Sequence, residues 1–480
     1  MTAAKVCRFA AALIGARSRG LSHLACRVAA CEQIRRSTMP HLTARSGYSS
    51  LTERLNRFPQ GAPASELLTK ILALLFSEKE AGLVGQLPIR PFSPAMAAHL
   101  WGVREVEAFR MLEGLADRAL MLDAEHDGEK MYVLPPPMAG FFGFSLMRVR
   151  GDIDQEALSG LLYQYLNLEE DFIRTLFTEG KTRLGRIFVG EDGITPENAT
   201  RVLDYERASK VIRGARKIGV GTCYCRHKMQ HLGRACSASM EVCMTFDAVA
   251  DPLIRHGHAR QIDAVECLDL LQQAREENLI QFGENVRGGV SFICNCCGCC
   301  CEALVAARKF CHLKPVHTTN FVAEIRRDLC SGCGRCVDVC PAEAVSLVSA
   351  NDPQHQWMRK GQLDPGRCLG CGVCVRVCKS GGLSLSPRPG RVITPVDSAH
   401  RVVSMAIERG TLQHLIWDNR ALSSHRALAA IVGVILRLPA VKQSLASSQL
   451  GSRYLDAMIK KRSAGPDREM ARSDTISFRS

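Results

Sequence analysis

The amino-acid sequence predicts an α+β protein made of several domains. Helical periodicity followed by a hairpin signal marks residues 51–137, and helices that alternate with short strands mark residues 138–320. A cysteine pattern that repeats after 38 residues marks residues 321–390, and helical periodicity returns in residues 391–462. The chain has 480 residues, 46% of them hydrophobic. Because a single core stops growing at roughly 250–300 residues, this length favours several domains.

Three helices and a hairpin are expected within residues 51–137. Apolar residues at helical spacing predict helices at 66–76 and at 104–120. A Ser-Pro pair predicts that another helix begins at Ser93. An Asp-Gly turn separates two predicted strands in residues 120–134. This order predicts a winged-helix-like domain, and the apolar face of its third helix should contain Val106, Phe109, Leu112 and Leu115. The balanced charge of that helix disfavours nucleic-acid binding and favours a docking or structural role.

The middle region, residues 138–320, is expected to mix helices with a small sheet. Helices are predicted at 153–166, 169–177, 198–217 and 262–278. Two short apolar strands, at 218–220 and 290–293, each lead into a Cys-x-Cys pair. Helix–strand alternation predicts a parallel sheet with ligands at the carboxyl ends of its strands.

Residues 321–390 contain two copies of one cysteine pattern. The first copy is Cys330-x2-Cys333-x2-Cys336-x3-Cys340-Pro341, and the second is Cys368-x2-Cys371-x2-Cys374-x3-Cys378 with Lys379 in place of the proline. This spacing resembles that of bacterial two-cluster ferredoxins and implies two [4Fe–4S] clusters. A pair of zinc sites fits poorly, because zinc motifs separate their x2 pairs by a longer gap. We refer to these residues as the ferredoxin-like module.

The resemblance also implies which cysteines hold each cluster. The fourth cysteine of a run normally binds the cluster of the other run. One cluster would thus be held by Cys330, Cys333, Cys336 and Cys378, and the other by Cys368, Cys371, Cys374 and Cys340. Glycines between the ligands allow tight turns, and the apolar segments 344–348 and 382–385 are expected to be strands.

Eleven further cysteines lie in residues 223–301, and all of them except Cys267 are candidate metal ligands. We expect one or two more iron–sulfur clusters, one held by Cys223, Cys225, Cys236 and Cys243, and another by four of Cys294, Cys296, Cys297, Cys299, Cys300 and Cys301. Zinc or redox-active thiols are the alternatives. Nearby Arg226 and Lys228 would raise a cluster's potential. His227 and His231 are expected at the polar surface, Cys267 is expected in the core, and Cys311 has no assigned role.

The net charge of +14 comes from the two ends of the chain, because residues 51–400 sum to zero. This distribution does not predict a nucleic-acid-binding domain. Residues 1–50 are expected to be a basic extension that is disordered or misassigned, with translation starting at Met39. Cys7, Cys26 and Cys31 would then have no role. Residues 463–480 are expected to be disordered. No stretch is long and apolar enough for a membrane span.

The wider sequence is similar to a group of long iron–sulfur proteins of anaerobic bacteria. The similarity covers residues 51–460 and includes the Cys-Tyr-Cys-Arg segment at 223–226 and the cysteine-rich segment at 294–301. It implies cytoplasmic electron transfer with a redox partner protein. The sequence therefore predicts an iron–sulfur electron-transfer protein. The alternatives are a metal- or thiol-based reductase subunit acting at residues 218–311 and a redox-sensing DNA-binding regulator.

Overall fold

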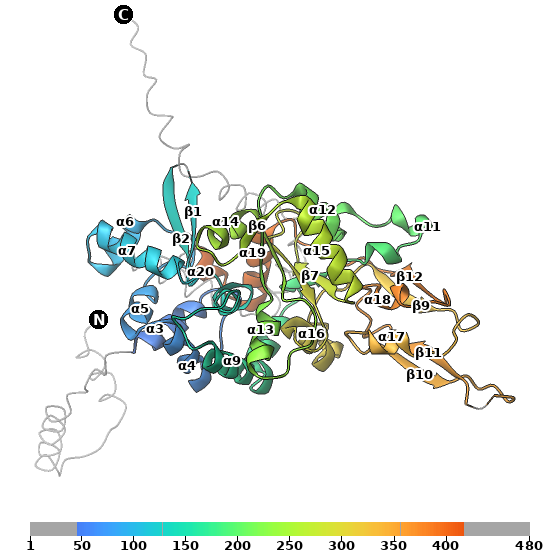
Figure 1. Ribbon diagram of the computed structural model, residues 1–480. Helices are drawn as coiled ribbons and strands as arrows, with labels where there is room; N and C mark the ends of the chain where they lie inside the picture. Colours follow the sequence, from blue (N-terminus) through green and yellow to red (C-terminus); the bar gives the residue numbers. More distant parts are fainter. Residues whose placement is uncertain (1–45, 127, 356, 417–480) are drawn as a thin grey trace, which may run out of the picture. The chain divides into compact units, whose positions relative to one another are not determined.

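The computed structural model describes residues 46–416, except residues 127 and 356 (Figure 1). The first part of this range is helical and ends in a hairpin. Its elements are α3 (Gly47–Leu55), α4 (Glu66–Leu75), α5 (Glu78–Val84), α6 (Pro94–Trp101), α7 (Glu105–Ala116), β1 (Leu122–His126) and β2 (Glu129–Val133). The strands pair antiparallel, with Leu122 opposite Val133, so the predicted hairpin is confirmed. The winged-helix assignment stays a prediction.

Two details of these helices test the sequence prediction. Ser93 caps α6 as expected, because its hydroxyl accepts a hydrogen bond from the backbone N–H of Met96 (3.3 Å). α7 ends at Ala116, four residues earlier than predicted, and the chain then turns through Ala119 with a left-handed φ of 54°. Val106 is 63% exposed, so the prediction that it belongs to the apolar face of α7 is wrong.

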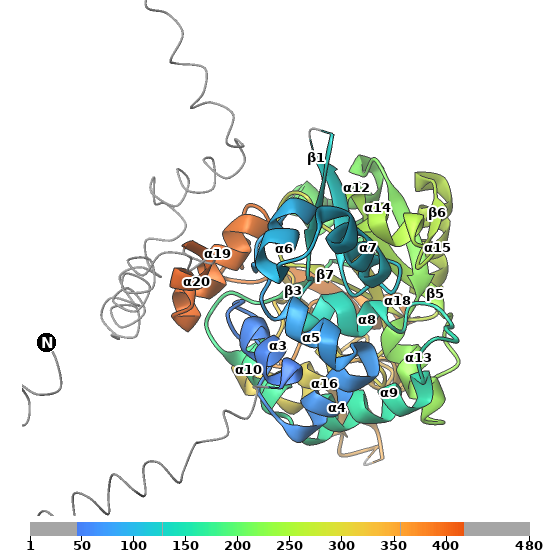
Figure 2. The same cartoon turned by 90° about the vertical axis from the view of Figure 1, so that its left-hand side faces the viewer.

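Short helices and turns follow the hairpin. They are η1 (Pro137–Phe141), α8 (Phe142–Phe144), α9 (Gln155–Tyr163), η2 (Gln164–Leu168), α10 (Asp171–Thr178), η3 (Glu191–Gly193), α11 (Pro196–Ala199), η4 (Asp204–Glu206) and α12 (Ala208–Gly214). α4 lies beside α9 (Figure 2). The single helix predicted at 198–217 is wrong, because the backbone is extended at Leu203 and Arg207 and divides this stretch.

A six-stranded sheet forms the centre of the middle region. Its strands are β3 (Gly185–Ile187), β4 (Ile218–Thr222), β5 (Glu241–Phe246), β6 (Arg260–Ile262), β7 (Ile280–Glu284) and β8 (Phe292–Cys296), in the order β3-β7-β8-β5-β4-β6. Every pair of neighbouring strands is antiparallel, so the predicted parallel sheet is wrong. The reason is that β5, which the sequence analysis did not predict, lies between β4 and β8 and is antiparallel to both.

Four longer helices connect or follow these strands. They are α13 (Tyr224–His231), α14 (Asp247–Arg255), α15 (Ala264–Glu276) and α16 (Glu302–Lys309). α13 begins directly after β4 and α16 begins shortly after β8, so both helices start at a cysteine segment. The sheet therefore places the two predicted cysteine segments at the beginnings of two helices.

The ferredoxin-like module has two similar halves. Its elements are β9 (Phe321–Ile325), α17 (Arg335–Asp338), β10 (Val345–Ser349), β11 (Arg359–Leu363), α18 (Val373–Arg376) and β12 (Leu383–Pro387). Each half is a strand, a cysteine run, a one-turn helix and a second strand. β9 pairs with β12 and β10 pairs with β11, both antiparallel. The strands predicted after each cysteine run are thus confirmed as β10 and β12.

Buried side chains connect these regions. One continuous core contains Leu51 from α3, Phe282 from the sheet and Leu385 from the module. A second core cluster includes Cys267, which confirms its predicted core position. The predicted boundaries at 137, 320 and 390 stay a prediction, and the first core crosses the first two of them.

The remaining helices of the described residues lie on either side of the module. η5 (Cys311–Leu313) precedes it, and α19 (Ser398–Arg409) and α20 (Leu412–Ile416) follow it. The predicted N-terminal extension with its Met39 start lies outside the described residues, except for residues 46–50. The helix expected up to residue 462 beyond α20, and the tail 463–480, also lie outside them. Among the described residues, no helix has the length and hydropathy that a membrane span requires.

Candidate metal centres

Glycines shape the cysteine loops of the ferredoxin-like module. Gly332 and Gly370 both have a left-handed backbone, with φ of 72° and 71°. A Cβ atom on Gly370 would lie 2.1 Å from the carbonyl oxygen of Phe321, and one on Gly332 would lie 2.1 Å from that of Arg359. Only glycine permits this close approach of the loops to the neighbouring strands.

The fourth cysteine of each run lies with the other run. Cys340, Cys368, Cys371 and Cys374 all line one cavity of about 20 Å³. Burial, together with the charges of Cys330, Cys333 and Cys378, raises the pKa of the Cys336 thiol. The crossed assignment of ligands to the two clusters stays a prediction.

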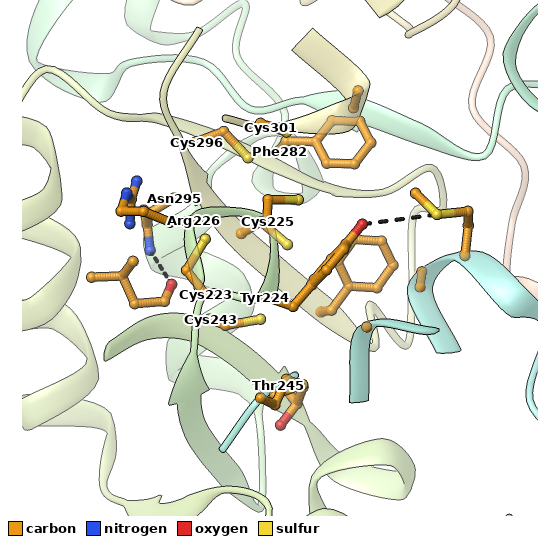
Figure 3. A pocket seen from close by; sticks show the side chains of 18 of the residues that line it. Cys223, Tyr224, Cys225, Arg226, Cys243, Thr245, Phe282, Asn295, Cys296 and Cys301 are labelled. Atoms are coloured by element: carbon orange, nitrogen blue, oxygen red, sulfur yellow. Dashed lines mark hydrogen bonds between the residues drawn. The ribbon is translucent and has the colours of Figure 1, made fainter. Parts of the chain in front are cut away.

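The middle cysteines converge from several elements, and eight of them line one cavity. In the sheet, Cys243 of β5 lies directly opposite Cys294 of β8, so both side chains project from the same face. Cys296 shares that face because it is two residues further along β8. Two of the eight, Cys297 and Cys300, also belong to the set described below. We call the other six the six-thiol chamber: Cys223, Cys225, Cys243, Cys294, Cys296 and Cys301. All of them except Cys294 are labelled in Figure 3.

The chamber encloses a cavity of about 90 Å³. Apart from the thiols, its wall is chiefly apolar and includes Met138, Phe144, Met147, Val242, Phe282 and Phe292. The Tyr224 ring lies beside the thiols, and its hydroxyl is 3.9 Å from the sulfur of Met138 (Figure 3). Burial raises the pKa of Cys223 to about 12. A bound metal would therefore be needed to hold this thiol as a thiolate at neutral pH.

Four other cysteines form a second, tighter set, the four-thiol group. Its members are Cys236, Cys297, Cys299 and Cys300, whose sulfur atoms all lie within 4.8 Å of one another. The Cys236 thiol is 3.5 Å from the sulfur of Cys297, and Cys299 and Cys300 are 3.6 Å apart. Cys299 is exposed and Cys300 is buried, so the group reaches from the interior to the surface.

Arg226 lies between the two sets. Its side chain is fully buried and lines the chamber. Its Nε donates to the sulfur of Cys236 (3.4 Å) and its Nη2 to that of Cys297 (3.6 Å). A hydrogen bond from Cys300, with help from the Arg226 charge, lowers the pKa of Cys297 to about 4 in spite of burial. The guanidinium thus favours the thiolate form that binds metals.

The segment after Cys225 is largely buried, so the prediction of a polar-surface position is wrong for His227, whereas His231 is partly exposed. α13 packs against α8 and α9, which encloses its charged side chains. His227 is 6% exposed, and its Nδ1 lies 2.8 Å from the carbonyl oxygen of Leu146. The His231 ring is 4.7 Å from that of His227, and burial lowers its pKa.

A buried ion pair joins the two cysteine segments. Lys228 of α13 contacts Glu302, the first residue of α16, and both side chains are almost fully buried. Asn167 completes the arrangement, because it accepts a hydrogen bond from Lys228 (2.9 Å) and donates one to Glu302 (2.8 Å). The two helix starts that carry Cys223 and Cys301 are therefore fixed relative to each other.

Comparison with known proteins identifies the module. Residues 329–381 match the family model of the 4Fe-4S dicluster domain. The chain is also similar to a protein of Methanosarcina thermophila described as "Probable ferredoxin", with 65% identity over 26 residues. That match covers 5% of this chain and 45% of the relative, so the chain spans less than half of the curated relative. No solved structure matches the chain. Residues 329–381 of this chain thus form a 4Fe-4S dicluster domain.

The sequence identified all ten middle cysteines as candidates but not their grouping. We expected Cys236 with Cys223, Cys225 and Cys243, whereas the structure places it with three cysteines of the second segment. Glu302 and the Tyr224 ring were not recognised as parts of the site, and Arg226 was expected to raise a cluster's potential but not to donate to two of the cysteine sulfurs. Their signal in the sequence is position, since each is adjacent to a cysteine. Cys311 lies in η5, outside both sets.

Proposed function

We propose that this protein transfers electrons between a redox partner and a buried iron–sulfur cluster in its middle region. Two [4Fe–4S] clusters would be held by Cys330, Cys333, Cys336 and Cys378 and by Cys368, Cys371, Cys374 and Cys340. A third would be held in the six-thiol chamber. When bound, these clusters supply one-electron transfer. The observation that carries the proposal is the convergence of the six chamber thiols on one chiefly apolar cavity, which Cys297 and Cys300 also line.

The cavity favours a cluster over a single ion. Its volume of about 90 Å³ is several times the roughly 10–15 Å³ that one water molecule needs. A single zinc ion lies among its four thiolates and needs no such space, whereas a cluster brings inorganic sulfide and several irons. The apolar wall disfavours filling by water alone.

The charge of a buried cluster is compensated by the fold. Cys223 is the N-cap of α13 and Cys301 is the N-cap of α16, so the positive ends of two helices meet the chamber. Arg226 adds a full positive charge at the wall. These groups stabilise thiolates that would otherwise be costly to bury.

A direct contact connects the module to the chamber. Gly298 lies against Pro341, and a Cβ atom on this glycine would lie 3.0 Å from the proline Cα. Pro341 follows Cys340, a proposed ligand of the second module cluster, and Gly298 lies between Cys296 and Cys301 of the chamber. This contact gives electrons a short route between the two sites.

The redox partner would dock at the first cysteine run. Cys333 is exposed, whereas Cys368 and Cys374 of the second run are buried. Around the first run there are five exposed cations and four exposed acids: Arg326, Arg327, Arg335, Arg359 and Lys379 against Glu324, Asp328, Asp338 and Glu343. This excess of positive charge fits an acidic redox protein.

The test is iron and acid-labile sulfide per chain in protein purified without oxygen. We expect about twelve irons in the wild type, from three four-iron clusters, and about four fewer in a Cys225→Ala/Cys296→Ala variant. The control is Cys267→Ala, which alters a buried cysteine of the other core cluster and should keep all iron. About eight irons in the wild type would exclude a chamber cluster.

A further inference from the structure

The four-thiol group differs in geometry from the other proposed centres. Among the described residues, it is the one set of three or more potential ligands whose donor atoms all lie within 4.8 Å of one another. The cysteines of the ferredoxin-like module, which match a family that binds four-iron clusters, form no such tight set. Neither do the six chamber thiols, which are spread around a cavity that Cys297 and Cys300 of the four-thiol group border on one side.

The spacing matches a single tetrahedral metal ion. Zinc–sulfur bonds of about 2.3 Å place the sulfurs of a tetrahedral site about 3.8 Å apart. In the four-thiol group, Cys236 lies 3.5 Å from Cys297 and 3.9 Å from Cys300, and Cys299 lies 3.6 Å from Cys300. A four-iron cluster separates its thiolates further, because each of them binds a different corner of the cube.

We infer that the four-thiol group binds one zinc ion, in a structural site separate from the iron–sulfur clusters. Four cysteine thiolates form a closed tetrahedral site with no open position for a substrate. The site draws Cys236 from the loop between α13 and β5 and the other three ligands from the segment after β8. The ion therefore joins two loops that are far apart in the sequence.

Arg226 completes the site. Its guanidinium donates to the sulfurs of Cys236 and Cys297 and to the carbonyl oxygen of Ser239. Four thiolates around a divalent zinc leave a net negative charge, which this buried cation offsets. Hydrogen bonds from neighbouring groups to metal ligands typically orient the ligands and stabilise the bound metal.

The position of the ion gives it a specific role. Gly298, which contacts Pro341 of the module, lies between two of the proposed ligands, Cys297 and Cys299. Fixing both neighbours of Gly298 fixes the contact between the two parts of the electron route. The inference goes beyond the proposed function, since the zinc site does not require a cluster in the chamber.

The decisive experiment measures zinc and iron per chain in full-length protein purified without oxygen and treated with a chelator to remove loosely bound metal. We expect one zinc per chain in the wild type. Cys299→Ala, which alters an exposed ligand, should lose that zinc and keep the iron content of the wild type. Cys267→Ala is the matched control and should keep both metals.

X-ray absorption at the zinc edge on the wild type gives a second test that needs no variant. We expect four sulfur neighbours at about 2.3 Å. Chelator-resistant zinc below half an equivalent would overturn the inference, as would nitrogen or oxygen neighbours or a loss of iron in Cys299→Ala. These readouts separate the two proposals, because a missing chamber cluster changes the iron count and leaves the zinc count unchanged.

Discussion

Gly298 lies so close to Pro341 that a Cβ atom on the glycine would be 3.0 Å from both the Cα and the carbonyl oxygen of the proline. Real Cβ atoms essentially never come closer than this to backbone atoms, and the neighbours here are not flexible side chains. The contact therefore depends on glycine. It joins the cysteine-rich segment of the middle region to the residue that follows Cys340.

Gly298→Val should slow electron transfer from the module to the chamber without loss of iron. The added side chain would push the two backbones apart and lengthen the route between the proposed clusters. Rapid-mixing absorbance measurements of cluster reduction would show the slower step. Gly114→Ala in exposed α7 is the control, because no atom lies within 4 Å of the added Cβ and helix stability should rise by up to about 1 kcal/mol. An unchanged rate in Gly298→Val would contradict the proposed route.

Arg226→Gln should lower the midpoint potential of the chamber cluster. A buried positive charge at the chamber wall favours the reduced, more negative state, so its removal makes reduction harder. A redox titration followed by EPR measures the change. Arg234→Gln removes an exposed cation near the same segment and should leave the potential close to that of the wild type. Equal potentials in the two variants would argue against a charge effect of Arg226.

Lys228→Ala should destabilise the protein by about 3–5 kcal/mol, because it leaves the Glu302 carboxylate buried without its partner. Replacing both residues, as Lys228→Met with Glu302→Leu, should cost much less, since no uncompensated charge remains. Thermal unfolding of the holoprotein provides the comparison. Lys70→Ala is the control, because its pair with Glu66 is exposed to solvent and should contribute little to stability. A double variant as unstable as the single one would contradict this account.

His258→Gln should make the protein less sensitive to mild acid. Burial lowers the pKa of His258 to about 4, while its Nε2 lies 3.0 Å from the carbonyl oxygen of Asp117. Between pH 6.5 and 4 the unfolded chain binds a proton at this position that the folded protein does not, so stability falls as the pH falls. The expected loss from pH 7.5 to 5.5 is about 1 kcal/mol in the wild type. The same loss in the variant, measured by thermal unfolding at both pH values, would show that other groups are responsible.

Electron transfer from an acidic donor protein should depend strongly on salt. Arg335→Glu/Lys379→Glu reverses two exposed charges beside the first cysteine run and should slow association at low ionic strength. The variant and the wild type should approach each other in rate at high salt, where these charges are screened. Lys70→Glu, a charge reversal in α4, is the control. Wild-type rates that do not vary with salt would remove the basis for this docking site.

The sequence predicted the ferredoxin-like module closely because its ligands are local. All eight cysteines lie within 49 residues at fixed spacings, and the strands beside them were recognised from short apolar segments. A local motif determines its own geometry, so no knowledge of the remaining chain was necessary. Lys379 in place of the second proline did not disturb the pattern, since β12 still pairs with β9.

The middle region was predicted only in part because its sites depend on contacts between distant segments. Cys236 and Cys297 are 61 residues apart, and their proximity follows from the antiparallel sheet, which the sequence did not reveal. The strand that contains Cys243 was missed because nearly all of its residues are buried. Its apolar and polar residues therefore do not alternate as they do in a strand with one exposed face. The charged residues after Cys225 led us to expect this segment at the surface. In the structure Lys228 is buried, because Glu302 and Asn167 bind its ammonium group in the interior.

The division of each middle site between two distant segments has a consequence for the life of the protein in the cell. Each proposed site takes ligands from both segments, so metal insertion and the final folding of this region become one event. In a chain without its metals, the thiols and helix N-termini that face each site would have no bound metal to contact, and this region would be loosely folded. Quality-control proteases act on such loosely folded chains. The cellular amount of this protein would therefore follow the supply of iron and zinc, even when its synthesis is constant.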